Sequence, residues 1–255
     1  MTNTTEESRN WFSSGGENYA RYRPHYPPEL AEYLSSLAPD TKHALDVGCG
    51  TGQLTRQLAE HFDAVKGIDP SASQLGNAVA HHRIDYACSP AEALPEQPLT
   101  YSLITAAQAA HWFKLDAFYQ EVRRVAVPQG ILALISYGVM QLDDDLNDRF
   151  RQFYYEEIGP FWPAERQLVD NGYRDIPFPF DEIAAPPLNI QLEWPLEALI
   201  GYISTWSAVA SAREAGREEM LRRFYEDIAT LWGTPTTCRP ILWPINMRIG
   251  RIEKS

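Results

Sequence analysis

Residues 44–52, which read ALDVGCGTG, place three glycines between two predicted elements of secondary structure. The apolar residues at the start of this segment predict a strand, and the spacing of Leu54, Leu58 and Phe62 predicts an amphipathic helix after it. Glycine accepts unusual φ angles and lets a ligand approach the backbone closely. A helix N-terminus also offers unpaired N–H groups to an anion. The segment therefore predicts a strand–turn–helix unit whose turn binds a nucleotide-type cofactor.

The spacing of the glycines distinguishes two kinds of cofactor. A dinucleotide-binding loop, Gly-x-Gly-x-x-Gly, needs a glycine or alanine where this chain has Gln53. The chain carries instead the pattern Asp-x-Gly-x-Gly-x-Gly, formed by Asp46, Gly48, Gly50 and Gly52. This pattern resembles motif I of the class I S-adenosylmethionine (SAM) dependent methyltransferases, whose turn holds the methionine part of SAM. The alternative is a turn that only connects a strand to a helix.

A second acidic residue, Asp69, ends the next predicted strand, residues 64–69. An Asp at this place in a βαβ unit can accept hydrogen bonds from both ribose hydroxyls of a cofactor. Hydrogen bonds to a charged acceptor contribute about 1.5–3 kcal/mol. We therefore expect Asp69 to bind the ribose. Its alternative role is the N-cap of a helix that begins near Ser71, directly after Pro70.

Strands and helices alternate through the first half of the chain, a pattern typical of a doubly wound α/β sheet. We expect a mostly parallel, seven-stranded, Rossmann-like sheet with an inserted and largely helical cap. Ligands of such sheets bind at the carboxyl ends of the strands. Further strands are predicted at residues 84–88, 101–107, 131–135, 188–192 and 245–249, and helices at 29–37, 53–62, 71–80, 116–126, 143–157, 195–212 and 217–232.

Three domain segments follow from these elements. Residues 1–140 are expected to form the SAM-binding core with an N-terminal lid. Residues 141–237 are expected to form the helical cap, with a strand near 188–194 that returns to the sheet. Residues 238–255 then supply a closing, antiparallel edge strand, and Pro244 suits an edge position.

Composition and charge exclude several other classes of protein. The net charge of −12 lacks the clustered Lys and Arg that bind a phosphate backbone, so no nucleic-acid partner is expected. Three cysteines without a CxxC pair predict a reduced, cytoplasmic protein without a metal site. Residues 1–7 are polar, which predicts no signal peptide. The apolar run 131–135 is too short to cross a membrane. We expect a monomer or a weak homodimer.

Three further segments indicate which branch of the methyltransferase superfamily the chain resembles. Residues 19–27 read YARYRPHYP, residues 107–113 read AQAAHWF, and residues 201–209 read GYISTWSAV. Together they are similar to the trans-aconitate methyltransferase-like (methyltransferase type 11) branch of the superfamily. The resemblance covers most of the chain and is strongest over residues 17–137.

This resemblance implies roles for residues on both sides of the reaction. An N-terminal segment would fold over SAM, with Tyr22 or Arg23 near the carboxylate of the cofactor. Gln108, His111 and Trp112 would lie beside the reactive methyl group. Gln108 would contact the cofactor, and His111 and Trp112 would be catalytic residues. The expected substrate-binding residues are Tyr19, Arg21, Tyr202 and Trp206.

Residues 89–95, which read SPAEALP, are similar to the adenine-contacting segment of the family. The family often has an acidic residue where this chain has Pro90, so we expect contacts to adenine through the backbone of Ala91 and Glu92. The alternative is an ordinary loop punctuated by proline.

Several of these side chains have simpler alternative roles. His111 suits a general base, because histidine titrates near neutral pH, or a neutral hydrogen-bonding wall. A carboxylate acceptor needs no base, since it is already ionised at pH 7. Trp112 has the alternative of a core aromatic. Arg21 and Arg23 suit bidentate binding of a carboxylate or surface ion pairs. The acidic run 143–145 suits the start of a solvated helix better than a metal site.

The sequence thus predicts an enzyme that transfers a methyl group from SAM to an oxygen, expected to be a carboxylate, of a small molecule. Two alternatives remain open at this point. One is a noncatalytic regulator that binds SAM, and the other is an NAD-dependent oxidoreductase of the same fold class.

Overall fold

The computed structural model describes residues 24–253. The chain divides into two compact units. Among the described residues, the sheet unit comprises 25–140, 165–190 and 243–253, and the helical unit comprises 24, 141–164 and 191–242. Residues 165–190, which we expected in the cap, thus group with the sheet unit.

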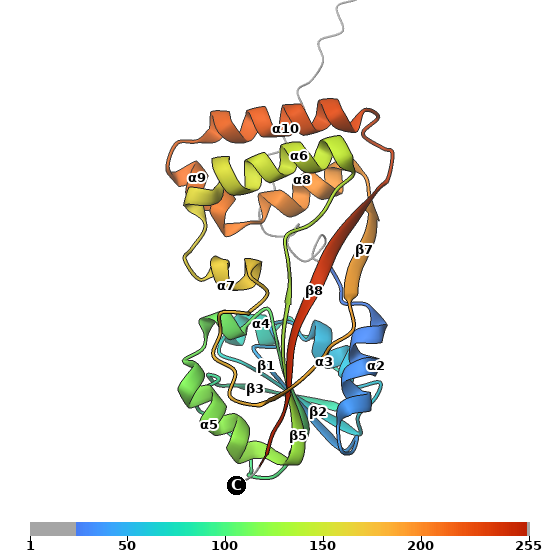
Figure 1. Cartoon of the computed structure of the whole chain (residues 1–255), viewed down its shortest axis with the longest axis vertical. Coiled ribbons are helices and arrows are strands. Elements are labelled where there is room, and N and C mark those ends of the chain that lie inside the picture. Colours follow the sequence, from blue (N-terminus) through green and yellow to red (C-terminus); the bar gives the residue numbers. More distant parts are fainter. Residues whose placement is uncertain (1–23, 254–255) are drawn as a thin grey trace, which may run out of the picture. The chain divides into compact units, whose positions relative to one another are not determined.

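Five parallel strands form the body of the sheet unit (Figure 1). Their order is β3-β2-β1-β4-β5, so β1 pairs with β2 on one side and with β4 on the other. The topological switch point of this doubly wound sheet therefore lies between β1 and β4, where ligands of such sheets bind. The strands are β1 (His43–Val47), β2 (Ala64–Asp69), β3 (Ile84–Cys88), β4 (Tyr101–Ala107) and β5 (Ala126–Tyr137).

Three later strands extend the sheet beyond β5. The expected C-terminal strand is β8 (Arg239–Arg251), which runs antiparallel to β5. It does not end the sheet, because β6 (Asp181–Ile183) pairs with its last residues and β7 (Leu188–Trp194) also pairs with it. Over the described residues the sheet therefore has eight strands, where we expected seven.

Helices cover both faces of the parallel strands (Figure 1). On one face lie α2 (Pro28–Leu37) and α3 (Gln53–Leu58), and on the other lies α5 (Leu115–Val125). The helix α3 is shorter than expected, because the chain turns after Leu58 and the N–H groups of Asp63 and Ala64 already bond to the segment before β1. The expected helix near Ser71 is likewise reduced to α4 (Ala72–Leu75).

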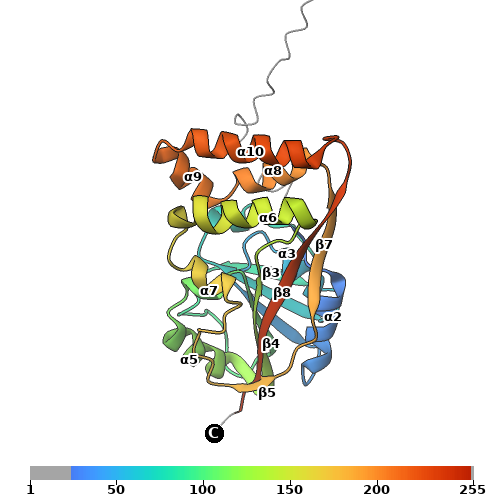
Figure 2. The same ribbon diagram turned by 45° about the horizontal axis from the view of Figure 1, so that its top comes forward.

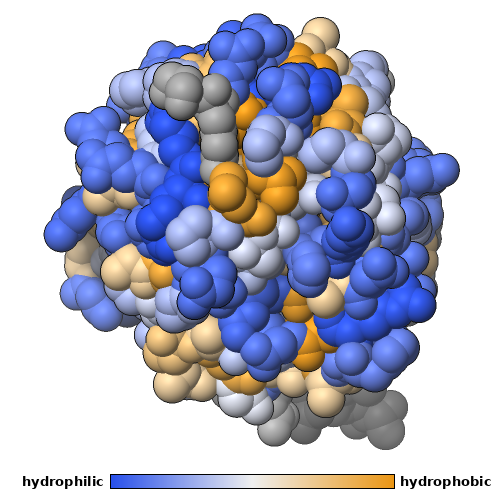
Figure 3. All heavy atoms as spheres, turned by 90° about the horizontal axis from the view of Figure 1, so that it is seen from below, coloured by the Kyte–Doolittle hydropathy of each residue, from blue (hydrophilic) through white to orange (hydrophobic). Residues whose placement is uncertain are grey.

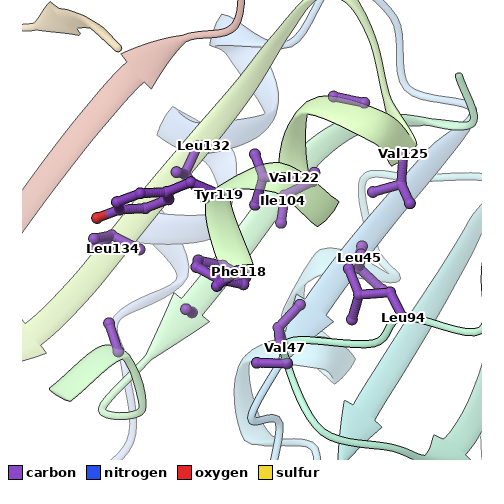
Figure 4. Packing of buried hydrophobic residues seen from close by; sticks show 14 of the residues in the cluster. Leu45, Val47, Leu94, Ile104, Phe118, Tyr119, Val122, Val125, Leu132 and Leu134 are labelled. Atoms are coloured by element: carbon purple, nitrogen blue, oxygen red, sulfur yellow. The ribbon is translucent and has the colours of Figure 1, made fainter. Parts of the chain in front are cut away.

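The apolar core under α5 holds the carboxyl ends of β1, β4 and β5 in place (Figure 4). Phe118 and Val122 of α5 are fully buried against Ile104 of β4 and Leu132 of β5. Burying a side chain of this size stabilises a fold by about 1.5–3 kcal/mol. The loops that follow these strands therefore begin at strand ends that the core holds in place.

The helical unit contains α6 (Asp144–Gln152), α8 (Leu196–Ser204), α9 (Ser207–Glu214) and α10 (Glu218–Trp232), as Figure 2 shows. Two aromatic rings join α10 to the π-helical turn after α6: Phe153 and Phe224 stack with their centroids 3.6 Å apart. The acidic run at Asp143 starts α6, as predicted, and Asp143 pairs with Arg239.

In the space-filling view of Figure 3, polar residues cover most of the visible face and leave only small apolar patches. Among the residues described, no helix is both long and apolar enough to span a membrane.

Candidate functional site

The turn after β1 takes the left-handed backbone conformation that its glycines predict. The φ angles of Gly48, Gly50 and Gly52 are 71°, 57° and 82°. A Cβ atom on Gly48 would lie 2.4 Å from the Cβ of Ala109, and one on Gly52 would lie 2.2 Å from the hydroxyl of Tyr86. Gly48 is therefore required by packing as well as by φ, and a side chain at Gly52 would have to displace Tyr86.

Gly50 differs from its two neighbours in the space beside it. Among the described residues, the nearest atom to an added Cβ would be an oxygen of Gln74, 3.9 Å away. The glycine is needed there for its positive φ, while the adjoining space stays open. A ligand can therefore reach the backbone of the turn at Gly50.

Backbone hydrogen bonds fix this turn to the end of β2. The N–H groups of Gly48 and Cys49 both donate to the carbonyl of Ile68, at 2.7 and 3.0 Å. The N–H of Gly52 donates to the carbonyl of Cys49 at 2.9 Å and so closes the turn before α3. The turn is thus held on one side and open on the other.

Asp46 lies inside the sheet, beneath the turn. It is 1% exposed, and its two carboxylate oxygens accept hydrogen bonds from the hydroxyls of Thr55, at 2.7 Å, and Thr105, at 2.8 Å. Burial raises its pKa to about 6, against the opposing effect of these hydrogen bonds. Asp46 therefore ties β1 to α3 and to β4, and supports the turn from within.

Asp69, at the end of β2, faces the turn. Its Oδ2 accepts a hydrogen bond from the N–H of Gly50, and its Oδ1 accepts one from the N–H of Ser71, both at 2.8 Å. The N-cap of α4 is Ser71, whose hydroxyl accepts from the N–H of Gln74, so the alternative role considered for Asp69 belongs to its neighbour. A carboxylate has about four acceptor sites. Within residues 24–253, two of them remain for a ligand.

The loop after β3 brings Ala91 and Glu92 toward the same end of the sheet. Ala91 is buried, and the carboxylate of Glu92 accepts a hydrogen bond from the N–H of Lys114 at 2.7 Å. Within residues 24–253, the backbone N–H of Ala91 has no hydrogen-bond acceptor. Because a buried N–H group needs a partner, this one is suited to a ligand.

Gln108 follows β4 in a strained conformation. Its φ angle is 53°, which is uncommon for a residue with a side chain and costs on the order of 1–3 kcal/mol. Its N–H donates to the carbonyl of Ile135 at 2.8 Å, and its side-chain amide donates to that of Tyr137 at 3.3 Å. Both bonds reach across to β5 and hold the end of β4 beside it.

His111 and Trp112 lie in a short 3₁₀ helix, η1 (Ala110–Trp112), just beyond Gln108. Burial, assisted by the charge of Arg166, lowers the pKa of His111 to about 4, so its ring is neutral at pH 7. Its Nδ1 lies 2.9 Å from the hydroxyl of Tyr173. Trp112 is 61% exposed, so the alternative of a core aromatic is wrong.

The predicted substrate-binding residues, and the two N-terminal residues predicted to contact the cofactor, fall elsewhere. Tyr19, Arg21, Tyr22 and Arg23 lie outside the described residues. Tyr202 and Trp206 belong to the helical unit, where Trp206 occupies the break between α8 and α9. The ring centroid of Trp206 lies 5.6 Å from that of Tyr202 and 5.3 Å from that of Trp162.

Sequence reasoning missed four side chains that shape this region. Thr55 and Thr105 bind Asp46, Tyr86 packs against Gly52, and Tyr173 binds His111. A threonine in the first turn after the glycines is a local signal that points to Asp46. No pattern in the sequence connects Tyr173 to His111.

The buried Asp46 predicts a pH dependence of stability. Because its pKa is raised from 3.8 to about 6 on folding, the stability contributed by its protonated form is fully present below pH 3.8 and is lost as the pH rises through 6. Asp46→Asn stays neutral, so the unfolding free energy of the wild type relative to this variant should fall by up to about 3 kcal/mol between pH 3.5 and 7. Urea unfolding at several pH values measures the difference. The exposed Asp63→Asn is the control, and a difference that is constant with pH would contradict the assignment.

Comparison with known proteins finds methyltransferases among those with similar sequences and structures. A family model described as a methyltransferase domain matches residues 44–130. A Dictyostelium discoideum protein assigned as a methyltransferase is 34% identical over 88% of this chain and 86% of its own length. A solved structure from Anaeromyxobacter dehalogenans, assigned as a type II methyltransferase, is 41% identical with a TM-score of 0.86, and the match covers 92% of this chain and all of that one.

A ubiquinone biosynthesis O-methyltransferase from Burkholderia ambifaria is 32% identical over 52% of this chain. The match covers 56% of that protein, so this chain spans little more than half of its length. The fold, the glycine turn and these relatives agree: the chain belongs to the class I SAM-dependent methyltransferases, and its cofactor is SAM.

Proposed function

We propose that this methyltransferase transfers the methyl group of SAM to an oxygen of a small carboxylic acid. The observation that carries the proposal is the character of His111, the one titratable residue in the segment 107–113 after β4. Its pKa of about 4 makes it a weak base at neutral pH. An efficient general base has a pKa near the working pH, whereas a carboxylate acceptor is already ionised and needs none. An oxygen acceptor also agrees with the name of the relative from Burkholderia ambifaria.

We assign the cofactor contacts to the open groups of the sheet unit. The backbone beside Gly50 would hold the methionine part of SAM, and the two unused acceptor sites of Asp69 would bind the ribose hydroxyls. The free N–H of Ala91, with the backbone of Glu92, would bind adenine. Tyr22 or Arg23 would bind the cofactor carboxylate, and Gln108 would lie beside the methyl group. Asp46 would act on SAM binding indirectly, by supporting the turn.

The chain supplies position and surroundings for the reaction. SAM, when bound, provides a methyl group on a sulfonium ion. A carboxylate oxygen of the acceptor forms a bond to this carbon as the carbon–sulfur bond breaks. The products are a neutral ester and a thioether, and no proton has to be removed. Holding the acceptor in line can contribute as much as about 7–11 kcal/mol. His111 and Trp112 are the residues we assign to this task.

Recognition of the acceptor would combine one charged group with apolar rings. Arg21 is suited to a bidentate contact with a carboxylate, and Tyr19 accompanies it in the N-terminal segment. Tyr202 and Trp206 would supply apolar surface, as members of the aromatic cluster of the helical unit. The resemblance to trans-aconitate methyltransferases supports a di- or tricarboxylic acid as the acceptor.

The ribose assignment predicts a specific pattern of binding energies. Asp69→Asn should weaken the binding of S-adenosylhomocysteine about ten- to a hundredfold, because a charge-assisted hydrogen bond is lost. Removing the 2′-hydroxyl of this ligand should weaken binding to the wild type but have little further effect on the variant. Calorimetry measures all four affinities. Asp85→Asn, on the exposed edge of β3, is the control. Independent effects of the variant and the deoxy ligand would show that Asp69 only supports the turn.

The acceptor class is tested with labelled SAM and paired substrates. Small di- and tricarboxylic acids should be methylated, and the carboxamide of each acid should not, because the amide is uncharged and a poor nucleophile. Catechols, amines, tRNA and protein complete the panel. Transfer that is restricted to any of these last four classes would overturn the proposed acceptor while leaving the methyltransferase assignment intact.

A further inference from the structure

Tyr173 is a buried residue of the sheet unit whose hydroxyl contacts His111. It follows α7 (Arg166–Asp170), is 0% exposed, and its hydroxyl lies 2.9 Å from Nδ1 of His111. These two residues are 62 positions apart in the chain. The contact therefore depends on the tertiary fold and not on local sequence.

The backbone of Tyr173 is held in an unfavourable conformation. Its φ angle is 61° and that of the preceding Gly172 is 64°. A Cβ on Gly172 would lie 2.8 Å from the side chain of Asn246 in β8. Two successive left-handed residues persist only where their surroundings fix them. The placement of the phenol is therefore imposed by the fold.

Arg248 of β8 supplies much of this restraint. Its guanidinium donates to the backbone carbonyls of Tyr173 and Ile176, each at 2.9 Å, and also pairs with Glu182 of β6. The N–H of Tyr173 donates to the carbonyl of Leu168 at 2.8 Å. The turn that carries the phenol is thus attached to β8 and to α7.

The surroundings of the phenol oxygen determine which way its hydrogen bond runs. Burial raises the pKa of Tyr173, so its hydroxyl keeps its proton. A buried hydroxyl needs an acceptor for that proton. In the part of the chain that the structure describes, Nδ1 of His111 is the one acceptor paired with it.

This direction fixes the tautomer of His111. Nδ1 accepts the proton of Tyr173, so the proton of the neutral ring is on Nε2, which has no hydrogen-bond partner within residues 24–253. The charged groups that act on the ring from α7 and its start are Arg166, which disfavours the imidazolium, and Glu165, which favours it. The ring therefore offers a single N–H group to a ligand and no basic nitrogen.

We propose that Tyr173 is a positioning residue that holds His111 as a neutral hydrogen-bond donor, so that its Nε2–H anchors an oxygen of the acceptor carboxylate. The other carboxylate oxygen is then free to face the methyl group. This inference rests on the proposed function and extends it, because a fixed donor selects an acceptor that is already ionised over a hydroxyl or ammonium group that must lose a proton. His111 takes up no proton in the reaction.

The tautomer can be measured without any turnover. In the full chain labelled with ¹⁵N-histidine, the signals lost in His111→Gln identify His111. We expect a protonated Nε2 and an unprotonated, hydrogen-bonded Nδ1 from pH 6 to 8. In Tyr173→Phe the Nδ1 signal should shift and the tautomers should mix. Tyr119→Phe, which removes another buried hydroxyl of the same unit, is the control and should leave the His111 signals unchanged.

Kinetics with the acceptor provide the second readout. Tyr173→Phe should lower kcat/KM about tenfold, mainly by raising KM for the acceptor, with unchanged affinity for S-adenosylhomocysteine as evidence of an intact fold. His111→Gln, which keeps an N–H donor of similar reach, should retain about tenfold more activity than His111→Leu. A proton on Nδ1 in the wild type, an unchanged His111 spectrum in Tyr173→Phe, or activity that falls with a pKa near 7 assigned to His111 would overturn the proposal. If no carboxylic acid is methylated while the tautomer depends on Tyr173 as stated, the proposed acceptor fails and the positioning role stands.

Discussion

The left-handed turn after β1 is the constraint on which the rest of the site depends. Its first two N–H groups share the carbonyl of Ile68, and its third glycine is packed against Tyr86. A side chain at Gly48 or Gly52 would collide with neighbouring atoms, whereas the space beside Gly50 is open. The same short segment therefore packs tightly between β1 and α3 and leaves its backbone at Gly50 accessible to a ligand.

Two carboxylates on either side of this turn have different tasks because their surroundings differ. Asp46 is enclosed by the hydroxyls of Thr55 and Thr105, and burial raises its pKa. Among the described residues, Asp69 accepts hydrogen bonds from backbone N–H groups alone, and two of its acceptor sites stay unused. We therefore infer an internal support in the first case and a ligand contact in the second, although both residues are acidic and lie at the ends of neighbouring strands.

Much of the sheet unit could be predicted from local patterns. The glycine turn, the parallel strands and the antiparallel β8 follow from apolar runs and from turn chemistry that act over a few residues. The position of β8 inside the sheet did not follow, because its partner β6 is three residues long and has no apolar alternation. The helix lengths of α3 and α4 were overestimated, since Phe62 is buried from a turn and not from a helix.

Residues of the candidate site could be proposed from the sequence where they belong to a motif. They could not be proposed where their position depends on tertiary contacts. Gln108 and His111 were proposed as site residues from the resemblance, but the backbone strain of the first and the partner of the second required the fold. Tyr173 lies in a turn whose conformation is set by Asn246 and Arg248, more than seventy residues further along the chain. Contacts of this range leave no periodic pattern in a single sequence.

We infer that the turn over residues 46–52, together with Asp69, forms the SAM site. Calorimetric titration of the full chain with S-adenosylhomocysteine, and separately with NAD, tests it most directly. We predict binding of S-adenosylhomocysteine at one site per chain and no heat of binding with NAD. Binding of NAD at this site, or no binding of S-adenosylhomocysteine by the folded chain, would contradict the claim.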